Sequence, residues 1–448
     1  MAEGKSQKSG PELARHIGLF SLVVYGVGDM VGAGIYGTIG VAAGMMGNAV
    51  WLAFGVSMIA ALLTGLCYAS LGSRYPRAGG AAYVTERAYG FKFLSYVVGL
   101  AVTASGLTSM AAGSNVFATT LGGMFPAIPV KVILVAFLLL IAAVNFIGIK
   151  ESMTANLVCT AVEIGGLLFV IFVGAKYWGK VNYLEVPQGS TLGMSMLLSG
   201  AVLTFYAFVG FEDMLNVGEE VKDPQKTLPK GIIIAVLVAT VVYMLVSITA
   251  VSVVEAKNLG DSKLGAPLAQ IVEKAAPWMP KEVYTFITLF AVANTALLNC
   301  VMGSRLLYGM ARQGLLPERL GAVHPRFRTP HIATLALTVI VVVLALSANI
   351  SQLASATSLL LLTCFCLVNG ALFILQSRPD EPKGSMEIPR IVPVLGVIVC
   401  LCLIFARLTA AGADKKAPLI AGFIIAVIAA LYFVLRPKVV GNAVIEEK

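Results

Sequence analysis

Twelve long apolar stretches follow one another along the chain, and they limit its fold more than any other feature. A helix needs about 20 apolar residues to cross the hydrocarbon core of a membrane. The chain has 448 residues, of which 58% are hydrophobic and only 12% are charged. A soluble domain carries about 25% charged residues. The sequence therefore predicts an all-α polytopic membrane protein surrounded by a lipid bilayer.

The apolar stretches divide the chain into two sets of five spans and one final pair. The expected spans cover residues 17–45, 50–72, 91–121, 129–147, 153–176, 194–218, 229–254, 283–312, 332–348, 351–376, 391–411 and 417–435. We expect a tail over 1–16, a first set over 17–176, a second set over 194–376, two further helices over 391–435 and a tail over 436–448. The connection over about 255–282 is long enough for a short helix.

Lysine and arginine predict the orientation of the chain. Twelve spans place both termini on one side, and that side collects 22 of the 32 Lys and Arg residues, against 10 on the other. Cytoplasmic loops collect positive charge, so we expect a plasma-membrane protein with both termini in the cytoplasm. The same rule accounts for the net charge of +9, and the sequence has no feature typical of nucleic-acid binding.

Glycines interrupt the first and the sixth span. Glycine is a poor helix former, and broken backbone inside a membrane is tolerated only where it lines a buried or wet cavity. The exposed N–H and C=O groups of a broken helix suit the carboxylate and the ammonium of a substrate. A pair of such breaks in corresponding positions indicates a transporter's binding site. The residues at the two breaks are Gly32, Ala33, Gly34 and Ile35, and Val209, Gly210 and Phe211.

An alternative interpretation is that these glycines only permit close packing of helices. The spacing of the two breaks argues against this packing interpretation. Gly32 and Gly210 are 178 positions apart, and each begins a set of five spans. Because five is an odd number, the second set starts on the opposite side of the membrane and is inverted relative to the first.

Several motifs, in order along most of the chain, resemble the amino acid–polyamine–organocation permeases. They lie at residues 32–35, 69–81, 210–212, 219–224, 228–230, 303–317 and 324–327. The resemblance implies the 5+5 inverted repeat shared with sodium-coupled leucine transporters (the LeuT-like fold), with discontinuous helices 1 and 6 and two extra C-terminal helices. It also implies that an amino acid or a related amine is transported by alternating access.

Aromatic and acidic residues around the second break complete the expected substrate site. The resemblance implies that Tyr206 closes over the substrate as a gate, with Phe208 beside it; the alternative is that Tyr206 is an ordinary core aromatic. An acid at the position of Glu212 is frequent in the family. Because neighbouring residues point about 100° apart on a helix, we expect only Glu212 to face the site and Asp213 to pair with a basic residue elsewhere.

Glu163 is the strongest candidate for coupling transport to an ion gradient. It lies in the middle of the fifth span, where the resemblance implies a lysine in proton-coupled relatives. Burial disfavours the charged form of a carboxyl group, so Glu163 can bind and release a proton as the protein moves. Asp29 is expected as its neighbour. The alternative is that Glu163 is a neutral packing residue.

Other coupling modes and other classes of protein stay open at this stage. Sodium would need oxygen ligands, and the eighth span offers Asn294, Thr295, Asn299 and Ser304. An uncoupled exchanger of amino acids or polyamines could use the same fold. A membrane enzyme or channel is the distant alternative, because the sequence has no His/Asp cluster, no H-E-x-x-H or G-x-S-x-G motif, no phosphate-cradling loop and no channel-filter motif. We expect no cofactor beyond the coupling ion and no bound metal.

The substrate class rests on a few polar residues of the third span. Gly106 and four hydroxyl side chains predict a pocket of modest size; the hydroxyls are Thr103, Ser105, Thr108 and Ser109. This favours neutral or small amino acids, followed by cationic amino acids and polyamines. The sequence leaves open which amino acid is bound and how many copies of the chain associate.

Overall fold

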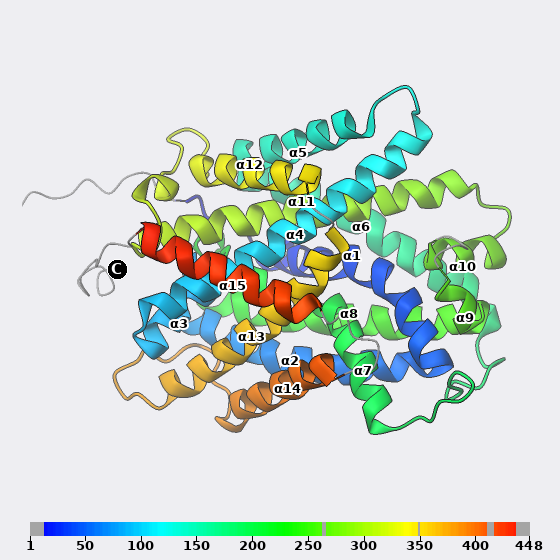
Figure 1. The fold of residues 1–448 in the computed structure, drawn as a ribbon. Helices are drawn as coiled ribbons and strands as arrows, with labels where there is room; N and C mark the ends of the chain where they lie inside the picture. Colours follow the sequence, from blue (N-terminus) through cyan, green and yellow to red (C-terminus); the bar gives the residue numbers. More distant parts are fainter. Residues whose placement is uncertain (1–12, 262–265, 348–349, 410–415, 436–448) are drawn as a thin grey trace, which may run out of the picture.

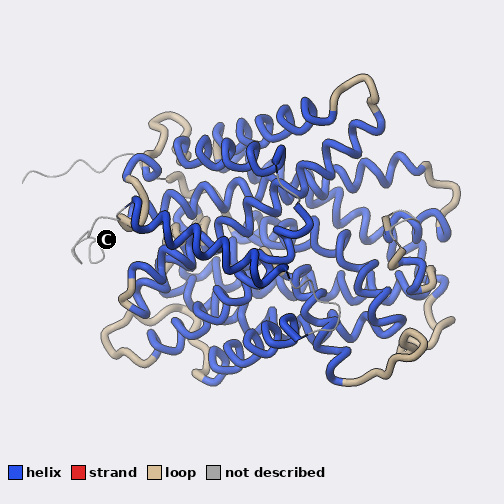
Figure 2. Tube along the Cα trace, in the orientation of Figure 1, coloured by secondary structure: helices blue, strands red, loops and turns tan. Residues whose placement is uncertain are grey.

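The fold is a bundle of helices without a sheet. The computed structural model describes residues 13–261, 266–347, 350–409 and 416–435, and within these ranges the only β-type pairing is an isolated parallel bridge between Ile17 and Val221. Figure 2 shows helices throughout the bundle and loops at its edges. The expected tail over 436–448 and most of the tail over 1–16 lie outside the described residues.

The helices fall at the positions of the apolar stretches. The long helices are α1 (Leu19–Met46), α2 (Val50–Arg74), α4 (Lys92–Met124), α5 (Val130–Ile147), α6 (Ile149–Gly174), α7 (Met194–Phe205), α8 (Pro224–Val253), α11 (Lys281–Arg312), α12 (His331–Ser347), α13 (Ile350–Gln376), α14 (Ile391–Thr409) and α15 (Lys416–Leu435). The short helices are α3 (Gly80–Tyr89), α9 (Ala256–Leu259) and α10 (Pro267–Ala275). In Figure 1, α9 and α10 lie at one end of the bundle and α3 lies at the other.

The structure confirms a multi-pass membrane protein. Among the described residues, nine helical segments are long and apolar enough to cross a membrane, and α12, α14 and α15 contribute three shorter apolar segments. Large apolar side chains such as Phe172, Leu419 and Phe433 are highly exposed on the outside of the bundle. Water would penalise such a surface, whereas lipid chains do not.

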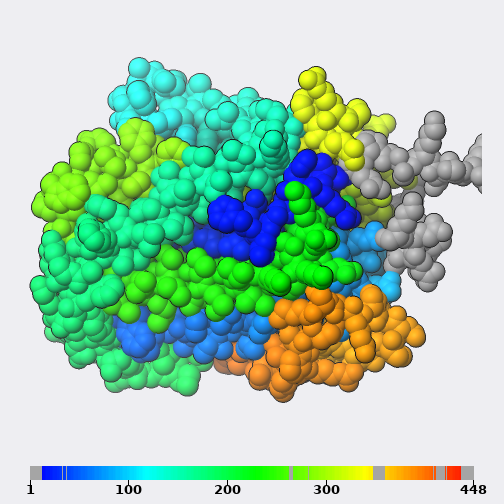
Figure 3. All heavy atoms as spheres, turned by 180° about the vertical axis from the view of Figure 1, so that it is seen from behind, coloured from blue at the N-terminus to red at the C-terminus, as the bar shows by residue number. Residues whose placement is uncertain are grey.

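The first helix lies at the centre of the bundle. It packs against α8, α6 and α11, while α14 and α15 pack on the outside against α2, α4 and α13. From the side opposite to Figure 1, the N-terminal part of α1 is visible between α6 and α8 (Figure 3). Because α1 contacts helices from both halves of the chain, a change in the position of α1 alters the packing of helices in both halves.

Both glycine-rich segments are broken where the sequence predicts. Within α1, Gly32 has φ −48° and ψ −108°, which is not helical. After α7 the chain makes a short 3₁₀ turn, η3 (Tyr206–Phe208), and then leaves helical geometry at Val209 and Gly210. Gly210 has a φ of +129°, which L side chains rarely adopt.

The segment after the second break differs from the expected half-helix. It consists of two 3₁₀ turns, η4 (Phe211–Leu215) and η5 (Gly218–Glu220). The carboxylate of Glu212 accepts a hydrogen bond from the N–H of Gly210, so a side chain takes over part of the role of helical hydrogen bonds here. The segment is also short and contains Gly218, and both features disfavour a regular α-helix.

The chain just before α1 is tied to the chain just after η5. The backbone N–H groups of His16 and Ile17 both donate to the carbonyl of Glu220 at 3.0 Å, and the N–H of Lys222 donates to the carbonyl of Ile17 at 2.9 Å. The Glu220 side chain forms a fully buried ion pair with Arg305 of α11, with 3.0 Å between Nε and Oε2. These contacts link three elements at one end of the bundle.

Candidate functional site

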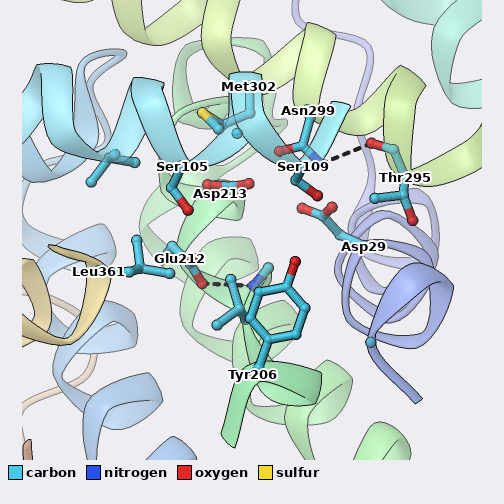
Figure 4. A pocket seen from close by; sticks show the side chains of 15 residues that line it. Asp29, Ser105, Ser109, Tyr206, Glu212, Asp213, Thr295, Asn299, Met302 and Leu361 are labelled. Carbon is cyan, nitrogen blue, oxygen red and sulfur yellow. Dashed lines mark hydrogen bonds between the residues drawn. The ribbon is translucent and has the colours of Figure 1, made fainter. Parts of the chain in front are cut away.

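The two breaks meet at a small buried cavity, which Figure 4 shows from close by. Residues from α1, α4, the broken segment after α7, α11 and α13 line it; they are Asp29, Gly34, Val102, Ser105, Gly106, Ser109, Tyr206, Val209, Gly210, Glu212, Asp213, Thr295, Asn299, Met302 and Leu361. Its volume of about 40 Å³ is enough for a few water molecules. An amino acid needs more room, so its binding requires the lining elements to move apart.

Glycine is required at the two places where the broken segments touch. A Cβ atom on Gly34 would lie 2.9 Å from the backbone of Ala207, and a Cβ on Gly210 would lie 3.0 Å from the backbone of Asp29 and Met30. Neither neighbour is a flexible side-chain end, so neither contact can relax cheaply. The breaks therefore pack directly on each other's main chain.

A tyrosine from α8 joins the two breaks. The hydroxyl oxygen of Tyr243 lies 2.6 Å from the carbonyl of Met30 and 2.7 Å from the carbonyl of Ala207. The hydroxyl has one proton to donate and two carbonyl acceptors, one from each broken segment. Sequence reasoning missed Tyr243, because it lies in an ordinary apolar helix and no local motif marks it.

Three carboxyl groups line the cavity, where the sequence predicted one. Glu212 faces it as expected, and its Oε2 accepts from the Gly210 N–H at 2.8 Å. Asp213 also lines it, and its carboxyl lies within hydrogen-bonding reach of Asp29. The expectation that Asp213 pairs with a basic residue is therefore wrong. The 100° rule assumes a continuous α-helix, whereas Glu212 here turns back onto the N–H two residues earlier.

The aromatic residues of the second break separate into one that lines the cavity and two that do not. Tyr206 lines it, as does Ser109 of α4. Phe208 is buried against the ring of Tyr243, with 5.0 Å between ring centroids. Phe211 stacks on Phe365 at 5.6 Å. The structure thus places Tyr206 where a gate could act, and it places Phe208 and Phe211 in the surrounding core.

The residues of the first break are also divided. Gly34 lines the cavity, whereas Ile35 is buried in the core and Gly32 packs against α11, where a Cβ would lie 2.1 Å from the hydroxyl of Thr295. The side chain of Ala33 lies outside the described residues. Only some of the residues expected from the third span line the cavity, namely Ser105, Gly106 and Ser109. Thr103 and Thr108 instead donate to backbone carbonyls of α4.

Glu163 lies in a second, adjacent polar cluster between α1, α6 and α11. It is fully buried, and its Oε2 accepts from the amide of Asn294 at 3.2 Å. Among the described residues no donor reaches its Oε1, and a Cβ on Gly32 would lie 3.5 Å from that atom. Asn156 and Thr160 complete the cluster through hydrogen bonds to Asn294. The free oxygen of Glu163 therefore faces the break in α1.

Asp29 was expected as the neighbour of Glu163, and the structure brings a second carboxyl group beside it. Asp29 interacts electrostatically with Glu163, but its hydrogen-bonding neighbour is Asp213. Asp29 thus belongs to the cavity and Glu163 to the cluster behind it. Together the two clusters can hold a proton, an ammonium group or another monovalent cation.

We expect Gly210→Ala to destabilise the site. A non-glycine residue at this φ costs about 1–3 kcal/mol, and the added methyl group would press on the backbone of α1. The free energy of unfolding of the purified protein in detergent should fall by about the same amount, measured by denaturant titration. The control is Gly165→Ala on α6, where a Cβ meets nothing within 4 Å and alanine favours the helix. Equal unfolding free energies of the two variants would contradict the packing described here.

Comparison with known proteins places these features in a family of transporters. The family described as "Amino acid permease" matches residues 17–435. An uncharacterized transporter of Mycobacterium tuberculosis is 31% identical over 399 residues, which cover 88% of this chain and 87% of the relative. The vacuolar cationic amino acid transporter 4 of Arabidopsis thaliana is 29% identical (84% and 66% covered), and the methylthioribose transporter of Bacillus subtilis is 29% identical (90% and 90% covered).

Proposed function

Because the chain belongs to the amino acid permease family, we propose that it moves amino acids across the plasma membrane by alternating access. The observation that carries this proposal is the meeting of two broken membrane helices at one buried cavity. Main-chain groups freed at such breaks can bind the carboxylate and the ammonium of an amino acid. The protein is a transporter and not an enzyme.

The proposed architecture is two inverted sets of five helices, over residues 17–176 and 194–376, followed by two further helices over 391–435. Both termini lie in the cytoplasm in this proposal. It is supported by the position of the breaks, one near the start of each set, and by the excess of Lys and Arg expected on the cytoplasmic side. Opening from either side would then be a movement of α1 and the broken segment after α7 relative to α6, α8 and α11.

We further propose that transport is coupled to proton entry and that Glu163 carries the proton. Its burial and its free oxygen beside the break in α1 support this role. Sodium coupling and uncoupled exchange are the alternatives. The oxygen atoms near Glu163 that could serve sodium belong to Asn156, Thr160, Asn294 and Thr295.

The cavity favours substrates with a positively charged amino group. Three carboxyl groups line it, and none of its described lining residues is basic. We propose that Tyr206 covers a bound substrate and that Ser105, Ser109 and Asn299 make further polar contacts with it, because all four line the cavity. Both neutral and cationic amino acids carry the required ammonium, so both belong to the proposed substrate class.

The test is uptake by purified protein in proteoliposomes. Radiolabelled amino acids are offered in pools, with and without an inward proton gradient and without sodium. Accumulation driven by the gradient supports proton symport. Equilibration without accumulation, accelerated by substrate inside the vesicles, would identify an exchanger, and uptake only with sodium would identify sodium as the coupling ion. No transport of any pool would contradict the proposed function.

A further inference from the structure

Two aspartates face each other across the point where the broken segments meet. Asp29 lies on α1, three residues before its break, and Asp213 lies three residues after the break at Gly210. Both side chains line the cavity (Figure 4), and the two carboxyl groups interact with each other directly. The backbone contact between Gly210 and Asp29 holds the two segments at this separation. The proximity of the carboxyl groups is therefore built into the packing of the main chain.

Neither aspartate has the donors that a charged carboxylate needs. Their exposed fractions are only 7% and 5%. Oδ2 of Asp29 and Oδ1 of Asp213 receive no hydrogen bond from any described residue. A buried carboxylate without donors is costly, and two of them in contact cannot both be ionised. A proton on one of the two supplies the missing donor.

The charges around the pair strengthen this argument. Two other carboxyl groups interact with the pair: Glu212 acts on both aspartates, and Asp29 acts on Glu163. The other titratable groups that face the pair are the neutral hydroxyls of four tyrosines, Tyr25, Tyr68, Tyr206 and Tyr243. Arg305 also acts on Tyr25, but its charge is paired with Glu220. The described surroundings thus contain further carboxyl groups and no unpaired cation to stabilise a doubly ionised pair.

We propose that Asp29 and Asp213 share one proton and form a second protonation site of the transporter, separate from Glu163. The proton joins α1 to the segment after the second break. Its loss replaces an attractive contact by repulsion between two carboxylates, which favours separation of the two segments and opening of the cavity. The role in transport rests on the function proposed above, whereas the proton site itself does not.

Infrared difference spectroscopy tests the site on purified full-length protein without any transport. The signal is the C=O stretch of protonated carboxyl groups in sodium-free buffer, identified by its shift in D₂O. We expect Asp29→Asn and Asp213→Asn each to lose the same one band, because an asparagine N–H replaces the shared proton and leaves the remaining carboxylate ionised. Glu163→Gln should retain this band, and the exposed Glu255→Gln is the matched control that should leave the spectrum unchanged.

Three results would overturn the proposal. They are the absence of the band from the wild-type spectrum, its persistence in both asparagine variants, or the loss of different bands in the two variants. Size-exclusion elution and the thermal unfolding midpoint show whether each variant is folded. If an asparagine variant does not fold, Asp213→Glu provides the second test, since it keeps a carboxyl pair and should keep a shifted band. A shared band without transport would overturn the proposed function and leave the proton site standing.

Discussion

We expect Glu163→Gln to abolish proton-driven accumulation of substrate while exchange of substrate across the membrane continues. An inward gradient of one pH unit provides about 1.4 kcal/mol per proton, which is enough for about tenfold accumulation by a one-proton symporter. Glutamine cannot take up or release a proton in this range, so the accumulation ratio should fall to about one. Uptake into proteoliposomes with and without a pH gradient measures both quantities.

The structure explains why this variant should fold and still exchange substrate. Glutamine has nearly the shape of glutamate, and its side-chain oxygen can replace Oε2 as the acceptor for Asn294. The cavity residues Glu212 and Tyr206 belong to a different cluster and are not altered. The change therefore removes the titrating group and leaves the substrate site in place.

Glu151→Gln is the matched control for this prediction. Glu151 lies on the same helix, α6, but near its N-terminus and exposed. The control should accumulate substrate like the wild type. If Glu163→Gln also accumulates substrate normally and keeps its full pH dependence, Glu163 does not carry the coupling proton.

The positions of the membrane helices and of both breaks could be predicted from the sequence, because each has a local cause. Apolar stretches of sufficient length must be helical in a membrane, and glycine clusters inside them mark the places where the helix fails. The expected breaks at Gly32 and Gly210 both lie where the structure departs from helical geometry. Only the segment after the second break differs from the expectation, since 3₁₀ turns follow Gly210 instead of an α-helix.

The composition of the cavity could be predicted only in part, because it depends on geometry beyond the break. Asp213 was expected to face away from Glu212, an inference that holds only for a regular helix. Phe208 was expected beside Tyr206 as part of the gate, but its ring packs into the core. Phe211 was expected for its main-chain groups at the break, and its ring also packs into the core. Once the chain leaves helical geometry, spacing along the sequence no longer predicts the direction in which a side chain points.

The sequence does not determine which residues form the long-range contacts. Tyr243 reaches Met30, which is 213 positions away, and Arg305 reaches Glu220, which is 85 positions away. Nothing near Tyr243 distinguishes it from other tyrosines in membrane helices. Arg305 resembled the many arginines that anchor helix ends at the cytoplasmic surface, yet it is fully buried.

The burial of Arg305 leads to the second large expected effect, on stability. Arg305→Met would leave the carboxylate of Glu220 buried without its partner, and it would also remove the donor to the side-chain oxygen of Asn145. Breaking a buried ion pair from one side costs about 3–5 kcal/mol. We expect a marked fall in the unfolding free energy of the purified protein in detergent, measured by denaturant titration.

The exposed pair of Lys257 and Glu255 provides the control, because both side chains are largely in solvent. Lys257→Met should cost less than about 1 kcal/mol. An Arg305→Met variant no less stable than Lys257→Met would contradict the buried pair.

The double variant Arg305→Met with Glu220→Gln separates the value of the pair from the cost of an unpaired charge. Removing both charges leaves no ion buried alone, so much of the loss should be recovered. The backbone carbonyl of Glu220, which accepts from His16 and Ile17, is unchanged by either substitution. If the double variant is as unstable as Arg305→Met, the hydrogen bonds from Arg305 to Asn145 and Ser304 hold this end of the bundle together more than the charge pair does. If it recovers, the stability lost in the single variant is the cost of burying the carboxylate of Glu220 next to the start of α1.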